Sequence, residues 1–183
     1  MMTLLEHALD ELPALLASTE GWRGMHIDYL PPHVDRAWRP WRECRLAIHR
    51  IHPIAAGGTA FLHPHPWPSA MAILDGSYEM SLGHGAGVVA PPIAAQLVMG
   101  PGTRYAMTDR DAWHDVRPVS GPVISVMLSG PPWEREMPAE PEVTQRPLTS
   151  EELGALLAEA HVLLAKSSSS SAALSPITRA SRG

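Results

Sequence analysis

The middle of the chain is a series of short apolar runs, each bounded by Gly, Pro, Asp or Ser. None of these runs is long or periodic enough for a helix, whereas each has the length and composition of a single strand. Many short strands separated by turns are typical of an antiparallel sandwich or barrel. The predicted strands are residues 45–52, 60–65, 70–74, 78–82, 94–99, 104–107, 113–117 and 123–128.

Apolar residues at helical spacing occur near the two ends of the chain. A leucine stripe predicts an amphipathic helix over residues 4–17. Thr3 and Glu6 are expected to form a capping box at its start. Pro13 is expected to kink this helix or divide it in two. A second capping-box pattern, Thr149-x-x-Glu152, opens a C-terminal helix. Its apolar stripe should pack on the barrel or on another subunit, and it consists of Leu153, Leu156, Leu157, Ala160, Leu163 and Leu164.

The remaining segments show neither the short apolar runs of strands nor the helical spacing of apolar residues. Residues 21–43 carry three prolines and are expected to wrap irregularly around the barrel, and residues 130–148, with five prolines, are expected to cover a sheet edge as a loop. A run of five serines starts the predicted disordered tail. The chain therefore divides into an N-terminal helix and wrapping segment (1–43), a barrel (44–132), a Pro-rich loop and C-terminal helix (133–166) and the tail (167–183).

Composition narrows the function classes. A chain of 183 residues suits one core, and its net charge of −5 without a long basic run argues against a nucleic-acid partner. The only cysteine, Cys44, excludes an internal disulfide and a Cys-rich zinc site. The first residues lack the basic and apolar regions of a signal peptide, and no membrane span is visible, so we expect a cytoplasmic protein.

The strongest chemical feature is the pair His63-x-His65. Side chains two residues apart on a strand share a face, so both imidazoles can enter one cavity. Neutral imidazole is a good ligand for transition metals, although two histidines on a solvated strand face would have no such role. His114 lies on a later predicted strand that an antiparallel barrel can return beside the pair, which makes it the natural third ligand.

The spacing Gly57-x5-His63-x-His65-x3-Ser69-x6-Gly76 resembles the first motif of the cupin superfamily, with Ser69 where many cupins carry a glutamate ligand. His114 stands where the second motif supplies its last histidine. The resemblance implies a mainly β protein, a single cupin-type antiparallel β-barrel (jelly roll), here with N- and C-terminal helices.

Within the cupins, residues 105–132 are similar to the thiol dioxygenases, the cysteine dioxygenase branch. Members of that branch bind ferrous iron through three histidines, so the resemblance implies Fe(II) at His63, His65 and His114. The Ser-x-His-x-Tyr element of cysteine dioxygenases falls on Ser125-x-Met127-x-Ser129 here. Its histidine and tyrosine are missing, which argues against cysteine as the substrate and leaves Met127 as an apolar pocket wall.

Other residues near these motifs have two interpretations each. Trp67 and Trp113 would wall a substrate pocket or serve only in packing, and Tyr105 would donate a catalytic hydrogen bond. Ser69 would be a weak ligand, a hydrogen-bond donor behind a ligand, or simply a small residue, which we favour. No arginine stands out as a carboxylate-binding group among the four weighed, which are Arg45, Arg50, Arg104 and Arg117.

The resulting hypothesis is a mononuclear non-haem Fe(II) oxygenase acting on a small molecule, with a homodimer as one permitted assembly. Three histidines would equally suit tetrahedral Zn with one water, and Ni, Mn or Cu also remain open. The alternatives are a non-catalytic ligand-binding cupin and a metal-dependent isomerase or lyase that uses no oxygen.

Overall fold

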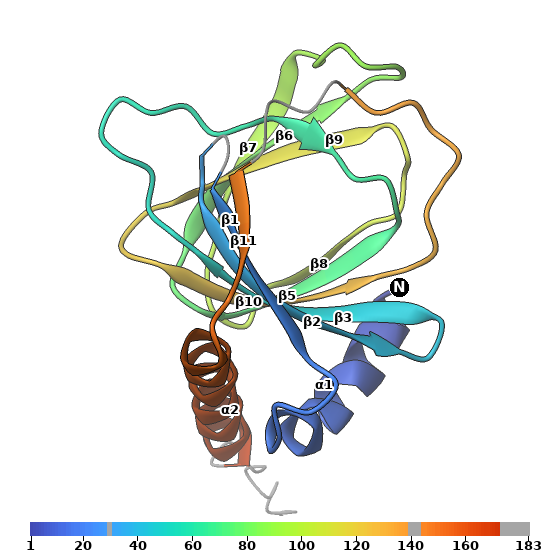
Figure 1. Cartoon of the computed structure of the whole chain (residues 1–183). Coiled ribbons are helices and arrows are strands. Elements are labelled where there is room, and N and C mark those ends of the chain that lie inside the picture. Colours follow the sequence, from blue (N-terminus) through green and yellow to red (C-terminus); the bar gives the residue numbers. More distant parts are fainter. Residues whose placement is uncertain (29–30, 139–143, 173–183) are drawn as a thin grey trace, which may run out of the picture.

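Two antiparallel sheets face each other in the computed structural model, which describes residues 1–28, 31–138 and 144–172 (Figure 1). Within these residues the larger sheet has seven strands, in the order β11 (Thr144–Pro147), β1 (Arg23–Asp28), β2 (Val34–Trp41), β3 (Cys44–Ile51), β10 (Val123–Ser129), β5 (Ser69–Asp75) and β8 (Arg104–Met107). The smaller sheet has the order β4 (His63–Pro64), β9 (Ala112–Pro118), β6 (Tyr78–His84) and β7 (Ile93–Met99). The predicted mainly β, antiparallel class is confirmed.

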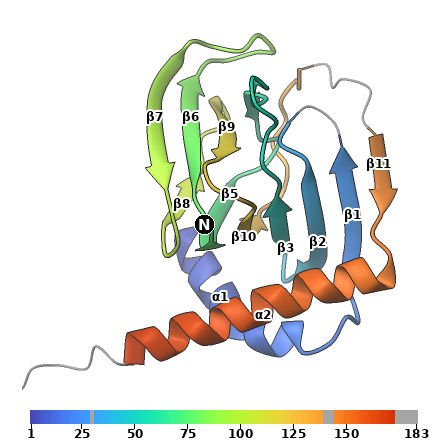
Figure 2. The same ribbon diagram turned by 90° about the vertical axis from the view of Figure 1, so that its left-hand side faces the viewer.

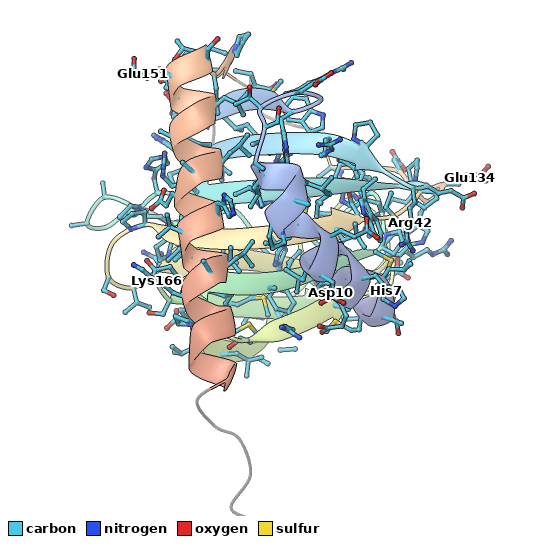
Figure 3. The ribbon with its side chains drawn as sticks, turned by 90° about the horizontal axis from the view of Figure 1, so that it is seen from below. His7, Asp10, Arg42, Glu134, Glu151 and Lys166 are labelled. Carbon is cyan, nitrogen blue, oxygen red and sulfur yellow. The ribbon has the colours of Figure 1, made fainter. Side chains whose placement is uncertain are left out.

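Both helices lie across the outer face of the larger sheet. Helices α1 (Met2–Leu16) and α2 (Ser150–Ala172) run beneath the strands in Figure 2, and Figure 3 shows them next to each other on that face. Leu5 and Leu12 of α1 and Leu156 and Leu157 of α2 are buried against the sheet. The C-terminal helix therefore packs on its own barrel. Within the described part of the chain, neither helix combines the length and apolar character that a membrane crossing requires.

Strand β10 shows how the larger sheet serves two purposes. Ile124, Val126 and Leu128 pack into the core beneath the helices. The alternate residues Ser125 and Met127 line a cavity between the two sheets. Because successive side chains of a strand point to opposite faces, one strand supports the apolar core and shapes the cavity.

The helix ends test the two predicted capping boxes. The box at Thr149 is confirmed, since the Thr149 N–H donates to Glu152 Oε2 (2.8 Å) and the Glu152 N–H donates to Thr149 Oγ1 (3.2 Å). The box at Thr3 is wrong, because α1 begins at Met2 without a side-chain cap. Glu6 instead accepts a hydrogen bond from Arg104, which removes it from capping.

Two predictions about irregular segments are corrected, and for α1 one of the two predicted effects of Pro13 is excluded. Residues 21–43 contain β1 and β2, so the larger sheet extends beyond the predicted barrel of 44–132. The prolines suggested an irregular segment, but two of them lie in the connection between β1 and β2, where no ladder hydrogen bond is needed. Residues 130–148 end in β11, which pairs with β1. Finally, α1 is not divided at Pro13, since buried Leu12 and Leu16 anchor the helix on both sides of it.

The predicted tail also differs from the structure at its start. Helix α2 continues to Ala172, through the serine run. Once a helix has formed, each further residue adds a backbone hydrogen bond without needing an apolar side chain. Residues 173–183 of the predicted tail lie outside the described residues.

Two local features position the site. The strand predicted over 60–65 pairs only at His63 and Pro64, because Pro64 and Pro66 have no N–H to donate. Gly76 turns the chain between β5 and β6 with φ +74°, and a Cβ there would lie 2.6 Å from the Pro122 carbonyl oxygen. Glycine is therefore required at the end of the predicted motif.

Candidate metal centre

Three histidines converge in the cavity wall, one on β4, one just after it and one on β9. His63 on β4 lies directly opposite His114 on β9, so their side chains share a face of the smaller sheet. His65 follows two residues after His63, and its ring centroid lies 4.6 Å from that of His114. One ring nitrogen from each of the three histidines lies within 4.8 Å of the others.

Hydrogen bonds on the far sides of two rings set their orientation. His63 Nδ1 lies 2.8 Å from the Phe61 carbonyl oxygen, which can only accept, so Nδ1 carries the proton and Nε2 keeps its lone pair. His65 Nδ1 lies 2.9 Å from Ser69 Oγ. This contact places His65 Nε2 toward His114. Ser69 thus lies behind a candidate ligand as its hydrogen-bond partner.

The three imidazoles are neutral at physiological pH. Burial lowers the pKa of His63, although its bond to Phe61 opposes the shift. Burial and the neighbouring rings hold the pKa values of His65 and His114 well below the usual value. Neutral imidazole is the form that binds metals, so the three rings are already in the metal-binding form at physiological pH.

The spacing of the nitrogens fits a metal ion. His65 Nε2 and His114 Nε2 lie 2.9 Å apart. Two ligands about 2.1 Å from a metal and at right angles to each other are separated by about 3 Å. His114 Nδ1 is buried with no hydrogen-bond partner among the described residues, so no bond on the far side of the ring orients it. The donor set is suited to Fe(II), Zn²⁺, Ni²⁺ or Cu²⁺.

We predict that Ser69→Ala weakens metal binding by about 10- to 100-fold while the protein stays folded, because His65 loses the group that orients its ring. The measurement is metal affinity by competition with a chelator. Ser129→Ala is the matched control, since Ser129 pairs with Ser69 in the ladder, is also buried, and donates its hydroxyl to the Arg45 carbonyl oxygen instead of to a histidine. Equal affinities of the two variants would contradict this role of Ser69.

The cavity that contains the histidines has a volume of about 290 Å³. Its walls combine aliphatic, methionine and aromatic side chains from both sheets. Of the predicted pocket residues, Trp67 and Met127 line it. Ser69 and Trp113 do not. Ser69 is buried behind His65 as its hydrogen-bond partner, so the favoured interpretation of it as simply a small residue is wrong. Trp113 is buried elsewhere in the smaller sheet and donates its indole N–H to the Gly85 carbonyl oxygen at 2.8 Å.

Tyr105 lines the cavity together with Tyr78, and their hydroxyl oxygens lie 2.6 Å apart. Burial raises the pKa of Tyr78 to about 12 and that of Tyr105 well above its usual value. Both hydroxyls therefore stay protonated near neutral pH. One of them donates to the other, and the proton of the accepting hydroxyl is left for another acceptor.

Sequence reasoning missed a cationic pair in the cavity wall. Arg36 Nε donates to His49 Nε2 at 2.9 Å, and both residues line the cavity. Burial first, and then Arg36 and Arg45, hold the pKa of His49 well below the usual value, so the ring stays neutral and accepts this bond. Arg36 was overlooked because its strand was taken for an irregular segment.

None of the four arginines weighed from the sequence lines the cavity. Arg45 stacks over the Trp67 ring at 4.4 Å, and Arg117 donates to the Gly58 carbonyl oxygen. Arg50 bonds Glu159 and Arg104 bonds Glu6. Strand alternation could have found Arg36, because Val34 and Arg36 are two residues apart and therefore share the strand face that lines the cavity.

No protein-family model matches this chain, and no curated protein matches it in sequence. Some solved structures are similar in fold. Hydroxypropylphosphonic acid epoxidase from S. wedmorenis shares 11% identity with a TM-score of 0.44, covering 58% of this chain and 55% of its own. An RmlC-like cupin from Shewanella frigidimarina shares 13% with a TM-score of 0.42, covering 60% and 86%.

A DMSP lyase structure shares 15% identity with a TM-score of 0.39, covering 52% of this chain and 47% of the lyase. This chain spans about half the length of the epoxidase and lyase chains. At such identities and TM-scores these likenesses concern part of the fold. The chemistry of the site rests on the residues of this chain.

Proposed function

We propose that this protein is a cupin metalloenzyme, a mononuclear non-haem Fe(II) oxygenase that acts on a small molecule in the manner of thiol dioxygenases. The observation that carries the proposal is the convergence of three neutral imidazoles, one buried and two partly buried, in the wall of a 290 Å³ cavity. A cavity of this size suits a compact ligand. The spacing of the cupin motif supports the same assignment.

The residues that would hold the metal are His63, His65 and His114. Ferrous iron held by these three imidazoles would keep positions open for other ligands and would supply redox chemistry toward O₂. Zinc with the same three ligands would supply only Lewis-acid chemistry. We favour iron because the three-histidine set without a glutamate resembles the thiol dioxygenases.

The other polar groups of the cavity suit a substrate with an acidic head. The Arg36 guanidinium stays charged at any physiological pH and would attract and orient a carboxylate. The Tyr78 and Tyr105 hydroxyls would donate one further hydrogen bond. Trp67 also lines the cavity, and its indole N–H is buried without a partner among the described residues, so an acceptor atom on a ligand would satisfy it.

The remaining wall favours an apolar substrate body. Met71 and Met127 line the cavity beside Ile51 and Val34. Met127 stands where cysteine dioxygenases have a histidine, so no hydrogen bond can form there to an amino group or an oxygen adduct. We therefore propose a small carboxylate with an apolar or thiol-bearing tail as the substrate, in preference to cysteine.

The test is oxygen uptake by Fe(II)-loaded protein with cysteine, 3-mercaptopropionate, other small thiols and non-thiol carboxylates. We expect the best substrate to exceed cysteine by at least about tenfold, since two hydrogen bonds of about 1 kcal/mol each are missing for cysteine. Zinc-loaded protein is the control and should consume no oxygen.

Two results would contradict the proposal. Rapid turnover of cysteine would overturn the assignment of the cavity wall. No uptake with any compound, in protein that holds iron, would favour the ligand-binding cupin or the oxygen-independent isomerase or lyase. Binding without turnover indicates the former, and anaerobic conversion of a bound compound indicates the latter.

A further inference from the structure

A second group of metal-ligating side chains lies on the opposite face of the larger sheet. Ile27 and Val34 line the cavity, so their neighbours His26 and Asp35 point to the outer face, which carries the helices. His26 and Asp35 are direct partners across β1 and β2. His52 follows the end of β3 and joins them, so the second cluster, His26, Asp35 and His52, connects three strands.

The contacts of the second cluster are short and converge on one carboxylate. His26 Nδ1 lies 2.6 Å from Asp35 Oδ1, and His52 Nε2 lies 2.9 Å from Asp35 Oδ2. One ligand atom from each residue lies within 4.8 Å of the others. Two imidazole nitrogens and one carboxylate oxygen are a common ligand set for divalent transition metals.

The charge around the second cluster suits a divalent cation. Asp35 supplies a carboxylate whose two oxygens are contacted by His26 and His52. Arg50 lies 3.4 Å from Asp35 but is also bound by Glu159 of α2, and Asp28 is paired with His33. Arg146 of β11 lies opposite His26 and is paired with Glu152, so each of the two arginines near Asp35 is also bound by a glutamate.

The alternative is a hydrogen-bonded cluster in which His26 and His52 each donate an N–H hydrogen bond to Asp35. A metal would require that each ring carry its proton on the other nitrogen, a change of tautomer, and that His26 Nδ1 and Asp35 Oδ1 move from 2.6 Å to about 3 Å apart. The side chains of His26, Asp35 and His52 are 22%, 13% and 35% exposed, so an ion and a completing water can reach them. In the candidate metal centre of the cavity, by comparison, His114 is buried.

We propose that His26, Asp35 and His52 form a second metal site that binds a divalent transition ion of the zinc class. The ion has three protein ligands, with water completing its coordination. It joins β1, β2 and β3 outside the cavity and thereby stabilises the part of the larger sheet whose edge strand is β11. The proposal is independent of the reaction in the cavity.

The test is calorimetric titration of the full, metal-free chain with Zn²⁺. We expect two bound ions per chain for the parent, one for His63→Ala/His114→Ala and one for His26→Ala/His52→Ala. His84→Ala is the matched control, because His84 makes an exposed pair with Asp109 at 3.2 Å and should leave the count at two. An unchanged count in His26→Ala/His52→Ala would overturn the proposal.

A second measurement does not depend on the folding of the second-cluster variant. In His63→Ala/His114→Ala, Co²⁺ should give visible absorption that saturates at one ion per chain, and Zn²⁺ should raise Tm, because a ligand that binds the folded state stabilises it. Adding Asp35→Asn to this variant should abolish both responses. Absence of saturable binding in the first variant, or its persistence after Asp35→Asn, would refute the second site.

Discussion

Replacing His63, His65 or His114 by alanine removes about one metal ion per chain and leaves the protein folded. Each variant should bind the cavity metal at least about 100-fold more weakly, since loss of a direct ligand exceeds the 10- to 100-fold effect of losing a residue that only orients one. Metal content of protein prepared anaerobically, with circular dichroism as the fold control, measures this.

The matched control for the metal prediction is His84→Ala, because His84 is exposed at the end of β6 and lies outside the group of three. It should retain the metal content of the parent. The assignment of the centre is wrong if all three histidine variants hold as much metal as His84→Ala. Loss of metal from only one or two of them would exclude the remaining histidine as a ligand.

Leu156→Ala should lower the free energy of unfolding by about 2–5 kcal/mol, which is the usual cost of removing a fully buried leucine side chain and leaving a cavity. Leu156 is 0% exposed and belongs to the core between α2, α1 and the larger sheet. The measurement is urea denaturation followed by circular dichroism on both variant and parent.

Val162→Ala on the same helix is the control, because Val162 is 53% exposed. A surface substitution of this kind changes stability by no more than about 0.5 kcal/mol. If the two variants unfold at the same urea concentration, α2 does not rely on the sheet for its stability. A second possibility named from the sequence, packing of α2 on another subunit, would then have to be tested by sedimentation.

Local patterns in the sequence were sufficient for most individual elements. The boundaries of β8 agree with the predicted 104–107, and those of β3 and β10 differ by one residue, because short apolar runs between turn residues have few alternatives to an extended strand. The second capping box was also readable, since it depends on two residues three positions apart. That the His63 and His65 side chains would face the same cavity followed from strand alternation alone.

Only the tertiary structure showed that Arg36 and His49 line the cavity and that the Tyr78 and Tyr105 hydroxyls are hydrogen-bonded. It also showed that Trp113 lies outside the cavity. These contacts depend on ladder register and on how two sheets face each other, which short-range patterns do not specify. The strands in residues 21–43 were likewise hidden, because β1 is stabilised by β2 and by β11, more than a hundred positions further along the chain. Local periodicity depends on adjacent residues, whereas a site between two sheets depends on which distant residues the folded core brings together.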